Sequence, residues 1–436
     1  MTASSSIKAE TLIQVEGEPP LGSFHINSGV EEEEEPPSKR SSLSIKEIFF
    51  SQVPEKDWND WKWQFRNRIT TVEELVKFIP LSSKEQAQLK LVISKYPFSV
   101  TPYYLSLINP EDKNDPIRKQ AIPCFEEITM ADMGEEDPLE EKRDSVVPGL
   151  VHRYPDRVLM VLTDICPMFC RHCTRKREWQ HGGWVRNDEE IEPMLNYIRN
   201  NPKVRDVIIS GGDVLTLSTE RLEKVLYQLR KIEHLEIIRI GSRYPVVLPQ
   251  RIDTELCDML SNYGPIWFNT HFNHPNEITP EAAKACDRLV RAGVPVNNQC
   301  VLLRGINDSV ETQLKLGHKL LKSKVRPYYL FQCDEVQGTE HLRTPVETGI
   351  KIIEGMRGHT SGLAVPTFVI DLPSGGGKVS LQPDYVLSHT KERLILRNYQ
   401  GRIITFRNPG ADLSQTQVES QVEEAVFDDN RTLVRS

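Results

Sequence analysis

The sequence predicts an α/β fold built on a parallel sheet or barrel, with a helical region in front of it. From residue 151 onward, short apolar runs alternate with segments of helical periodicity, which is typical of parallel strands joined by helices. Between about residues 45 and 125, apolar residues instead recur at three- and four-residue spacing, the pattern of amphipathic helices. Within this region, Thr71 and Glu74 have the spacing of a capping box.

Seven apolar runs are the predicted strands: "RVLMVLT", "DVIISG", "EIIRIGS", "IWFNTHF", "PVNNQCVLL", "RPYYLFQ" and "PTFVID". The predicted helices between them include "NDEEIEPMLNYIRNN", "STERLEKVLYQLRKI", "TPEAAKACDRLVRAG" and "SVETQLKLGHKLLKS". In a barrel, the active site forms at the C-terminal ends of the strands. Residues that directly follow these runs are therefore the first candidates for a functional site.

Composition divides the chain into four segments. Residues 1–44 are rich in Ser, Pro and Glu, which predicts a disordered acidic tail. Residues 45–150 form the helical region and an acidic connection, and residues 151–380 form the barrel. Residues 381–436 form a C-terminal extension.

Of the 436 residues, 38% are hydrophobic and 27% are charged, as expected of a soluble globular protein. No run of about 18 apolar residues occurs, so no membrane-spanning helix is expected, and the N-terminus lacks a signal-peptide pattern. A net charge of -8 gives no reason to expect nucleic acid as a partner. Three clustered cysteines suit metal ligation in a reducing, cytoplasmic compartment better than a disulfide framework. Five others are scattered: Cys124, Cys257, Cys286, Cys300 and Cys333.

The stretch "DICPMFCRHCTRKR" follows the first predicted strand and holds Cys166, Cys170 and Cys173. Three unrelated core cysteines would not be expected at this density. A structural zinc ion takes four ligands, so a fourth such as His172 or a distant cysteine would be needed. An iron–sulfur cluster is normally held by four thiolates, and three would leave one iron free for a small molecule. We favour the cluster with an open iron and keep zinc as the alternative.

Polar residues also mark other predicted strands. "SGGD" at 210–213 ends the second strand, where two glycines let the backbone approach a ligand closely, although an ordinary turn is the simpler interpretation. His271 alone would be interpreted as a core histidine, but several polar strand faces together indicate a lumen that holds polar ligands. The positions that share a face are Asn269 with His271, Asn297 with Gln299, and Arg326 with Tyr328, Gln332 and Asp334.

The stretch "SGGGK" at 374–378 is not a P-loop. That motif needs a glycine five residues before its Gly-Lys pair and a Ser or Thr after it, and Leu372 and Val379 stand there. A lysine on a mobile glycine loop can instead bond covalently to an aldehyde cofactor. A solvated surface lysine is the simpler alternative.

Two short basic stretches have competing interpretations. Arg153 and Arg157 in "HRYPDR" could bind phosphate through forked hydrogen bonds or form a basic turn before a strand. The run from Arg175 to Arg177 could be a solvated face or a nucleic-acid patch. One short run in an acidic chain does not support nucleic acid.

Together these stretches resemble the lysine 2,3-aminomutase family of the radical S-adenosylmethionine superfamily. The C-x3-C-x2-C motif is similar to that of the superfamily. The family resemblance runs from about residue 45 to about 405 and rests on "WNDWKWQFRNRI", "HRYPDRVLMVLTDICPMFCRHCTRKR", "SGGD", "RIGSRYPVVLPQRI", "FNTHFNHPNEIT", "VRPYYLFQCD" and "RGHTSGLAVPTFVIDLPSGGGK". It implies a partial (β/α)6-type barrel that uses a [4Fe–4S] cluster, S-adenosylmethionine and pyridoxal 5'-phosphate.

Matched residue by residue, the resemblance implies the following roles. The cluster would be held by Cys166, Cys170 and Cys173. S-adenosylmethionine would be bound by Ser210, Gly211, Gly212, Asp213, His271 and Gln299. Pyridoxal phosphate would be held by the catalytic Lys378 and, through its phosphate, by Arg153 and Arg157. For the substrate, the α-carboxylate would bind Arg175, and a lysine ε-ammonium would bind Asp334 and Asp371.

The implied activity is an isomerase reaction, the conversion of L-lysine to β-lysine by migration of the amino group from C2 to C3. An electron donor such as a flavodoxin or ferredoxin and a homo-oligomeric assembly are expected with it, whereas nucleic acid and membrane are not. A long cationic side chain needs opposite charge at its far end, so the two aspartates favour lysine. Two alternatives stay open: a related enzyme for another amino acid or a protein-bound lysine, and a non-catalytic zinc-binding protein.

The chain departs from the family in two places. No cysteine follows Cys333, so the structural zinc that some members hold near their C-terminus is not expected. Phe331 stands where an aromatic residue with a hydroxyl could have touched the cofactor.

Overall fold

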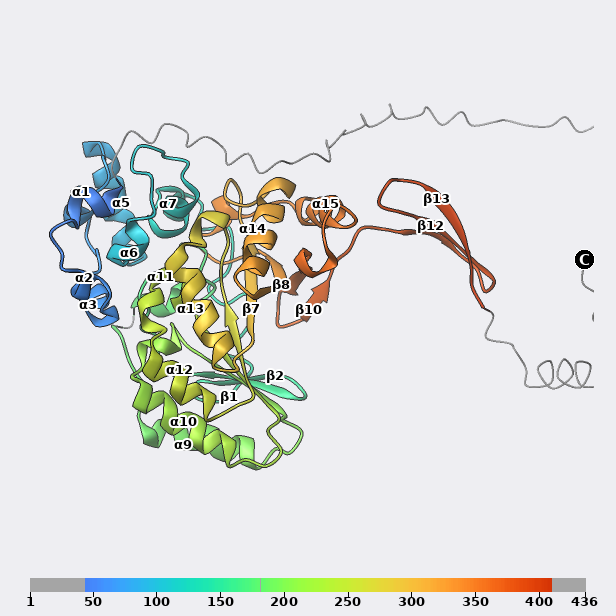
Figure 1. Ribbon diagram of the computed structural model, residues 1–436, viewed down its shortest axis with the longest axis horizontal. Helices are drawn as coiled ribbons and strands as arrows, with labels where there is room; N and C mark the ends of the chain where they lie inside the picture. The colour runs from blue at the N-terminus through green and yellow to red at the C-terminus, as the bar shows by residue number, and fades with distance from the viewer. Residues whose placement is uncertain (1–43, 181, 410–436) are drawn as a thin grey trace, which may run out of the picture. The chain divides into compact units, whose positions relative to one another are not determined.

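The computed structural model describes residues 44–180 and 182–409. The predicted tail, apart from Ser44, and residues 410–436 of the extension lie outside the described residues. The largest element is a ten-stranded sheet in the order β1 to β10 (Figure 1). Strands β3 to β9 are parallel neighbours, and the sheet ends in two edges, so it is an open, partial barrel. All seven predicted strands are confirmed: β3 Arg157–Val161, β4 Asp206–Ser210, β5 Ile237–Gly241, β6 Ile266–Thr270, β7 Val296–Leu302, β8 Val325–Gln332 and β9 Thr367–Leu372.

Three antiparallel strands extend this sheet and were not predicted. They are β1 Ser145–Val147, β2 Leu150–Tyr154 and β10 Gly377–Ser380. They are short, and β2 and β10 carry a histidine, an arginine and a lysine among few apolar residues, so they lack the apolar run of a buried strand. Strand β10 pairs with β9 and sets Lys378 opposite Asp371.

The helices between the parallel strands pack against the sheet (Figure 1). The four predicted ones are confirmed as α9 Asp188–Arg199, α10 Thr219–Arg230, α13 Pro280–Arg291 and α14 Val310–Lys322. Each begins after a residue whose side chain caps the helix, namely Asn187, Ser218, Thr279 and Ser309. The others are α11 Tyr244–Val247, α12 Thr254–Ser261 and α15 Val346–Met356. The 3-10 turns are η1 Lys176–Gln180, η2 Val214–Thr216, η3 Pro249–Arg251, η4 Pro275–Glu277, η5 Glu340–Leu342 and η6 Gly362–Ala364.

The N-terminal helical region is confirmed and shares one hydrophobic core with the sheet. Its buried residues include Trp58, Leu75 and Tyr104. The capping box at Thr71 and Glu74 is present, with both reciprocal hydrogen bonds. Its helices are α1 Ile45–Phe49, α2 Glu55–Trp58, α3 Trp61–Arg66, α4 Val72–Leu75, α5 Ser83–Lys95, α6 Pro102–Leu105, α7 Pro116–Ala121 and α8 Glu126–Thr129. The acidic connection predicted before the barrel therefore also contains α8 and β1.

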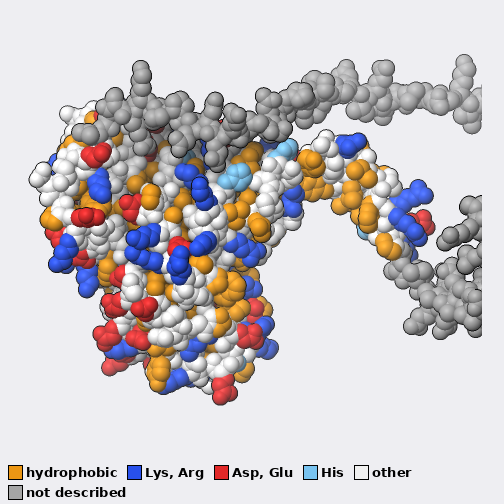
Figure 2. Space-filling view, viewed as in Figure 1, with side chains coloured by type: hydrophobic (Ala, Val, Ile, Leu, Met, Phe, Trp, Pro, Cys, Tyr) orange, Lys and Arg blue, Asp and Glu red, His pale blue; other side chains and the backbone are white. Residues whose placement is uncertain are grey.

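The described part of the C-terminal extension forms a second, three-stranded antiparallel sheet. Its strands are β11 Val386–His389, β12 Arg393–Arg397 and β13 Ile403–Arg407. Arg397 pairs with Glu354 on α15 at 2.5 Å. Apolar side chains along this sheet are exposed (Figure 2), among them Val386, Leu387, Ile403, Ile404 and Phe406. Across the described ranges, no helix combines the length and the apolar character that a membrane crossing requires.

Candidate active site

The three clustered cysteines lie in the loop that follows β3. Cys166, Cys170 and Cys173 are half-buried and carry free thiols. The loop is fixed to the N-terminal helical region, since the Phe169 amide donates to the Ser99 carbonyl at 3.1 Å. Within residues 44–180 and 182–409, no group of three or more His, Cys, Asp or Glu side chains is arranged to hold a metal ion.

The turn after β4 packs directly on this loop. A Cβ atom at Gly211 would lie 2.4 Å from the Thr163 carbonyl oxygen, and one at Gly212 would lie 2.4 Å from the Asp164 carbonyl oxygen. Glycine is needed where backbones approach this closely. The predicted stretch from Ser210 to Asp213 therefore shapes the start of the cysteine loop, and its contact with a ligand stays a prediction.

A buried ion cluster, which the sequence did not predict, clamps the cysteine loop to the helical region. Glu127 on α8 is fully buried and accepts hydrogen bonds from Arg171 at 2.9 and 2.6 Å and from Lys176 at 2.8 Å. Lys176 also donates to the Gly338 carbonyl, in the loop after β8, at 2.7 Å. Burial on its own would raise the pKa of Glu127, but the two cations lower it to about 2. The carboxylate is therefore charged and ties three segments together.

Two histidines stack beside the cysteine loop. The Nε2 atoms of His172 and His271 lie 2.9 Å apart, and the two rings are 10° from parallel. The side-chain amide nitrogen of Asn273 lies 3.1 Å from Nε2 of His271. Burial lowers the pKa of both rings. Nδ1 of His172 is buried without a partner among the described residues. Gln299, which is also predicted to bind S-adenosylmethionine, lines a cavity that His271 does not line.

That cavity has a volume of about 420 Å³ and brings together the three residues predicted for pyridoxal phosphate and one of the aspartates predicted for the substrate. Arg153, Arg157, Lys378 and Asp371 line it with Gln299. Aromatic side chains complete its wall: Tyr328 and Phe331, whose positions the sequence indicated, and Tyr154 and Tyr329, which it did not. The Arg157 guanidinium lies 4.7 Å from the centre of the Tyr154 ring and pairs with Asp156 at 3.0 Å.

The regular alternation predicted along β8 is wrong. The pairing of β7 with β8 shifts register in mid-strand, and the neighbours Tyr328 and Tyr329 both line the cavity. Gln332, predicted to share a face with Tyr328, donates instead to the Thr344 carbonyl at 2.7 Å. A β-bulge inserts one extra residue into the strand, so the side chains beyond it no longer follow the two-residue alternation that the sequence predicts.

Lys378 forms an ion pair inside the cavity. Its Nζ lies 2.7 Å from each carboxylate oxygen of Asp371, and its backbone amide donates to the Tyr154 hydroxyl at 2.9 Å. Gly375 and Gly377 adopt φ angles of 68° and 83°, which glycine adopts without strain. Burial lowers the pKa of Lys378, while the Asp371 carboxylate acts in the opposite direction.

Asp334 supplies a second carboxylate beside this pair. With Asp371, it lines a small cavity of about 70 Å³. Burial, followed by repulsion from Asp371, raises the pKa of Asp334 to about 7, although Lys378 opposes the shift. Two carboxylates thus face one lysine ammonium, and a second cation would satisfy both.

Of the three arginines predicted to bind ligand anions, Arg153 and Arg175 are paired with acids that precede β1. Arg175 donates to Glu141 through two nitrogens at 2.9 and 2.7 Å, and Arg177 donates to the same carboxylate at 2.8 Å. Arg153 donates to Asp144 at 2.8 Å. Burial on its own would raise the pKa of Glu141, but the two arginines lower it to about 2. Carboxylates of the chain therefore accept the arginine hydrogen bonds that are predicted to bind the anionic groups of the ligands.

Family models match two parts of the chain. The radical SAM superfamily matches residues 160–316, and a model described as Lysine-2,3-aminomutase matches residues 353–433. L-lysine 2,3-aminomutase of Acetoanaerobium sticklandii is 55% identical, over 84% of this chain and 89% of that protein. L-lysine 2,3-aminomutase of Clostridium subterminale is 56% identical, over 83% of this chain and 86% of that protein. The chain belongs to the lysine 2,3-aminomutase family.

Relatives of this chain are named for different amino-acid substrates. Glutamate 2,3-aminomutase of Clostridioides difficile is 42% identical, over 89% of this chain and 92% of that protein. A structure of Streptococcus suis SuiB bound to S-adenosylmethionine is 13% identical and covers 50% of this chain and 51% of that chain, with a TM-score of 0.38, which carries no argument about this site. Membership therefore establishes an isomerase, and the choice of substrate has to be argued from the site.

The described residues fit the [4Fe–4S] cluster, S-adenosylmethionine and pyridoxal phosphate that lysine 2,3-aminomutases use. Three thiols can each bind one iron of a cluster without converging on a single ion, and the fourth iron is then free. The unpartnered Nδ1 of His172 offers a hydrogen bond close to these thiols. A 420 Å³ cavity lined by one lysine and three arginines has the size of a cofactor site and the charge that a phosphate needs.

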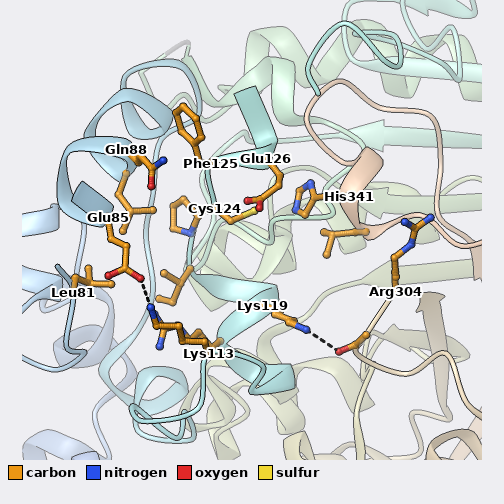
Figure 3. A pocket seen from close by; sticks show the side chains of 16 residues that line it. Leu81, Glu85, Gln88, Lys113, Lys119, Cys124, Phe125, Glu126, Arg304 and His341 are labelled. Atoms are coloured by element: carbon orange, nitrogen blue, oxygen red, sulfur yellow. Dashed lines mark hydrogen bonds and ion pairs between the residues drawn. The ribbon is translucent and has the colours of Figure 1, made fainter. Parts of the chain in front are cut away.

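A larger cavity lies away from these residues (Figure 3). It has a volume of about 570 Å³ and is formed by α5, the segment from Lys113 to Glu126 and the loops after β7 and β8. Lys113 on its wall pairs with Glu85 at 2.5 Å, and Lys119 donates to the Gly305 carbonyl at 3.4 Å. None of the predicted site residues lines it. The smaller cavity around Lys378 is therefore the candidate active site.

Replacing Glu141 tests the pairing with Arg175. Glu141→Gln is expected to lower the free energy of unfolding by about 3–5 kcal/mol, because two largely buried guanidinium groups lose their carboxylate. Saturating L-lysine is expected to stabilise this variant more than the wild type, since its α-carboxylate can supply the missing charge. Urea unfolding with and without lysine measures both effects. Glu236→Gln, which breaks a surface pair with Arg205, is the control, and equal lysine effects in Glu141→Gln and wild type would contradict the assignment of Arg175.

Proposed function

We propose that this aminomutase converts L-lysine to β-lysine (3,6-diaminohexanoate) by moving the amino group from C2 to C3. The observation that carries the proposal is the pair of carboxylates, Asp334 and Asp371, beside Lys378. A lysine side chain ends in a cation that both acids can bind, whereas the carboxylate of glutamate would meet two like charges there. Relatives at 55–56% identity that are named for lysine support the same substrate.

We assign the cofactors to the residues that the resemblance implies. Cys166, Cys170 and Cys173 hold the cluster, and Ser210 to Asp213, His271 and Gln299 bind S-adenosylmethionine. Lys378, Arg153 and Arg157 hold pyridoxal phosphate. When bound, these groups supply a radical that removes a hydrogen atom from C3 and an aldehyde that takes up the migrating nitrogen.

The chain's own residues orient the substrate by exchanging their ion-pair partners for its charged groups. Arg175 binds the α-carboxylate of lysine in place of Glu141. With pyridoxal phosphate present, Lys378 would hold the cofactor through its side-chain nitrogen instead of pairing with Asp371, which would then be able to bind the ε-ammonium of the substrate. Burial lowers the pKa of Lys378, which favours the neutral amine that must attack the aldehyde. The aromatic wall formed by Tyr328, Tyr329 and Phe331 excludes water from the reacting atoms.

We further propose a homo-oligomer in the cytoplasm that receives electrons from a flavodoxin or ferredoxin. The exposed apolar side chains of the β11–β13 sheet support an oligomer, because a patch of this kind usually marks an interface. Eight free cysteines support a reducing compartment. In functional terms, residues 45–150 form a helical cap, residues 151–380 the catalytic barrel and residues 381–436 an assembly segment.

Replacing one cysteine tests the cluster. Cys170→Ser is expected to lose iron and with it the reductive cleavage of S-adenosylmethionine, because a serine hydroxyl does not replace a thiolate ligand. Metal and sulfide analysis after anaerobic purification and a cleavage assay measure both. Cys257→Ser and Cys286→Ser are matched controls, because these cysteines are buried in α12 and α13. A Cys170→Ser protein with wild-type cleavage would remove the hypothesis.

Replacing the lysine tests the cofactor site. Lys378→Ala is expected to lose the absorbance of covalently held pyridoxal phosphate and to keep the iron–sulfur chromophore. Borohydride reduction of the wild type followed by peptide mapping identifies the bonded lysine. Lys351→Ala, which changes an exposed lysine on α15, is the control. Label on a lysine other than Lys378 would show that the assignment is wrong.

Replacing the aspartates tests specificity. Asp334→Asn and Asp371→Asn are each expected to weaken lysine binding about tenfold to more than a hundredfold, since a charge-assisted hydrogen bond contributes roughly 1.5–3 kcal/mol. Turnover of lysine compared with norleucine measures the preference. Because the pKa of Asp334 is about 7, lysine affinity should rise with pH through 7 in the wild type and lose this dependence in Asp334→Asn. Unchanged preference for lysine in both variants would refute the role of the aspartates.

A further inference from the structure

An arginine donates a hydrogen bond to one of the clustered cysteines. Nη1 of Arg243, in the loop after β5, lies 2.8 Å from Sγ of Cys170. Among the described residues, Arg243 is the arginine whose guanidinium group donates to a cysteine sulfur. A charged N–H group at this distance is a strong donor. Neither the sequence motifs nor the proposed ligand contacts assign a role to Arg243.

The surroundings of Arg243 fix the direction of this hydrogen bond. Its Nη2 donates to Glu277 at 2.7 Å and to Gln120 at 2.6 Å, and its Nε donates to the His271 carbonyl at 3.1 Å. Its side chain is 8% exposed, and that of Glu277 is fully buried. The guanidinium is thus held on its other nitrogens and presents Nη1 to Cys170.

We propose that Arg243 is a positioning residue that raises the reduction potential of the iron–sulfur cluster through its hydrogen bond to Cys170. Reduction by one electron adds negative charge to the cluster and its sulfur atoms. Hydrogen bonds to these sulfurs and nearby positive charge stabilise that added charge, and both are known to set the potential of such clusters. The donor protein loses the one electron that the cluster gains, and no proton moves because the guanidinium stays protonated.

The charge of Glu277 does not cancel this effect. Its carboxylate binds Nη2, whereas Nη1 donates directly to the sulfur. The group of this ion pair that contacts Cys170 is therefore the positive one, and attraction falls with distance. The inference rests on the proposed cluster assignment, in which Cys170 is an iron ligand.

A redox titration of the cluster, followed by electron paramagnetic resonance, tests the inference. Arg243→Gln is expected to lower the ratio of reduced to oxidised cluster about tenfold at a fixed potential, as for loss of one charge-assisted hydrogen bond, which corresponds to a midpoint about 59 mV more negative. Arg243→Lys keeps the positive charge, so its midpoint potential should lie between those of the wild type and Arg243→Gln. Gln120→Leu removes a neutral partner of Nη2 and should keep the wild-type midpoint. An Arg243→Gln protein that holds its cluster at the wild-type midpoint would overturn the inference.

A second measurement needs no variant, in case Arg243→Gln does not hold iron. Wild-type protein labelled with 15N in the arginine guanidinium groups is expected to show a 15N coupling to the reduced cluster in pulsed magnetic resonance. Absence of that coupling would overturn the inference even if the cluster assignment holds. A wild-type protein that contains no iron and sulfide would instead overturn the proposed function, and the inference with it.

Discussion

A charge buried at the C-terminal edge of the sheet needs an opposite charge within hydrogen-bond distance, and every part of the site depends on this constraint. The carboxylates that meet it come from segments far away in the sequence. They assemble the site from the helical region, the cysteine loop and the strand ends. The pairs are Glu127 with Arg171 and Lys176, Glu277 with Arg243, Glu141 with Arg175, and Asp371 with Lys378.

These pairs divide into two kinds by their burial and position. Glu127 and Glu277 are fully buried and do not line the cavity around Lys378. Glu127 binds the cysteine loop directly, and Glu277 binds Arg243, which donates to Cys170. Glu141 and Asp371 line the cavity around Lys378, where a ligand can reach their partners. Free lysine carries both a carboxylate and a side-chain ammonium. We propose that it takes the place of Glu141 on Arg175, while Glu141 keeps its ion pair with Arg177, and the place of Lys378 on Asp371.

The parallel strands and their helices could be predicted from the sequence, because buried strands are continuous apolar runs. Lys378 and Arg153 were assigned through the family resemblance, and the structure brings both to one cavity. The partners Glu127 and Arg243 could not be predicted, since pairing across distant segments leaves no local pattern. The bulge that sets both Tyr328 and Tyr329 into the cavity was missed for a similar reason: strict alternation was assumed.

The most direct test of amino migration follows the nitrogen itself. Under argon, the reconstituted protein would be incubated with S-adenosylmethionine, pyridoxal phosphate, dithionite and L-lysine labelled with 15N at its 2-amino group, and the products examined by nuclear magnetic resonance. The expected result is 15N bonded to C3 of β-lysine, with the 6-amino group unlabelled. Label that stays at C2, or that is released as ammonia, would contradict the proposed activity.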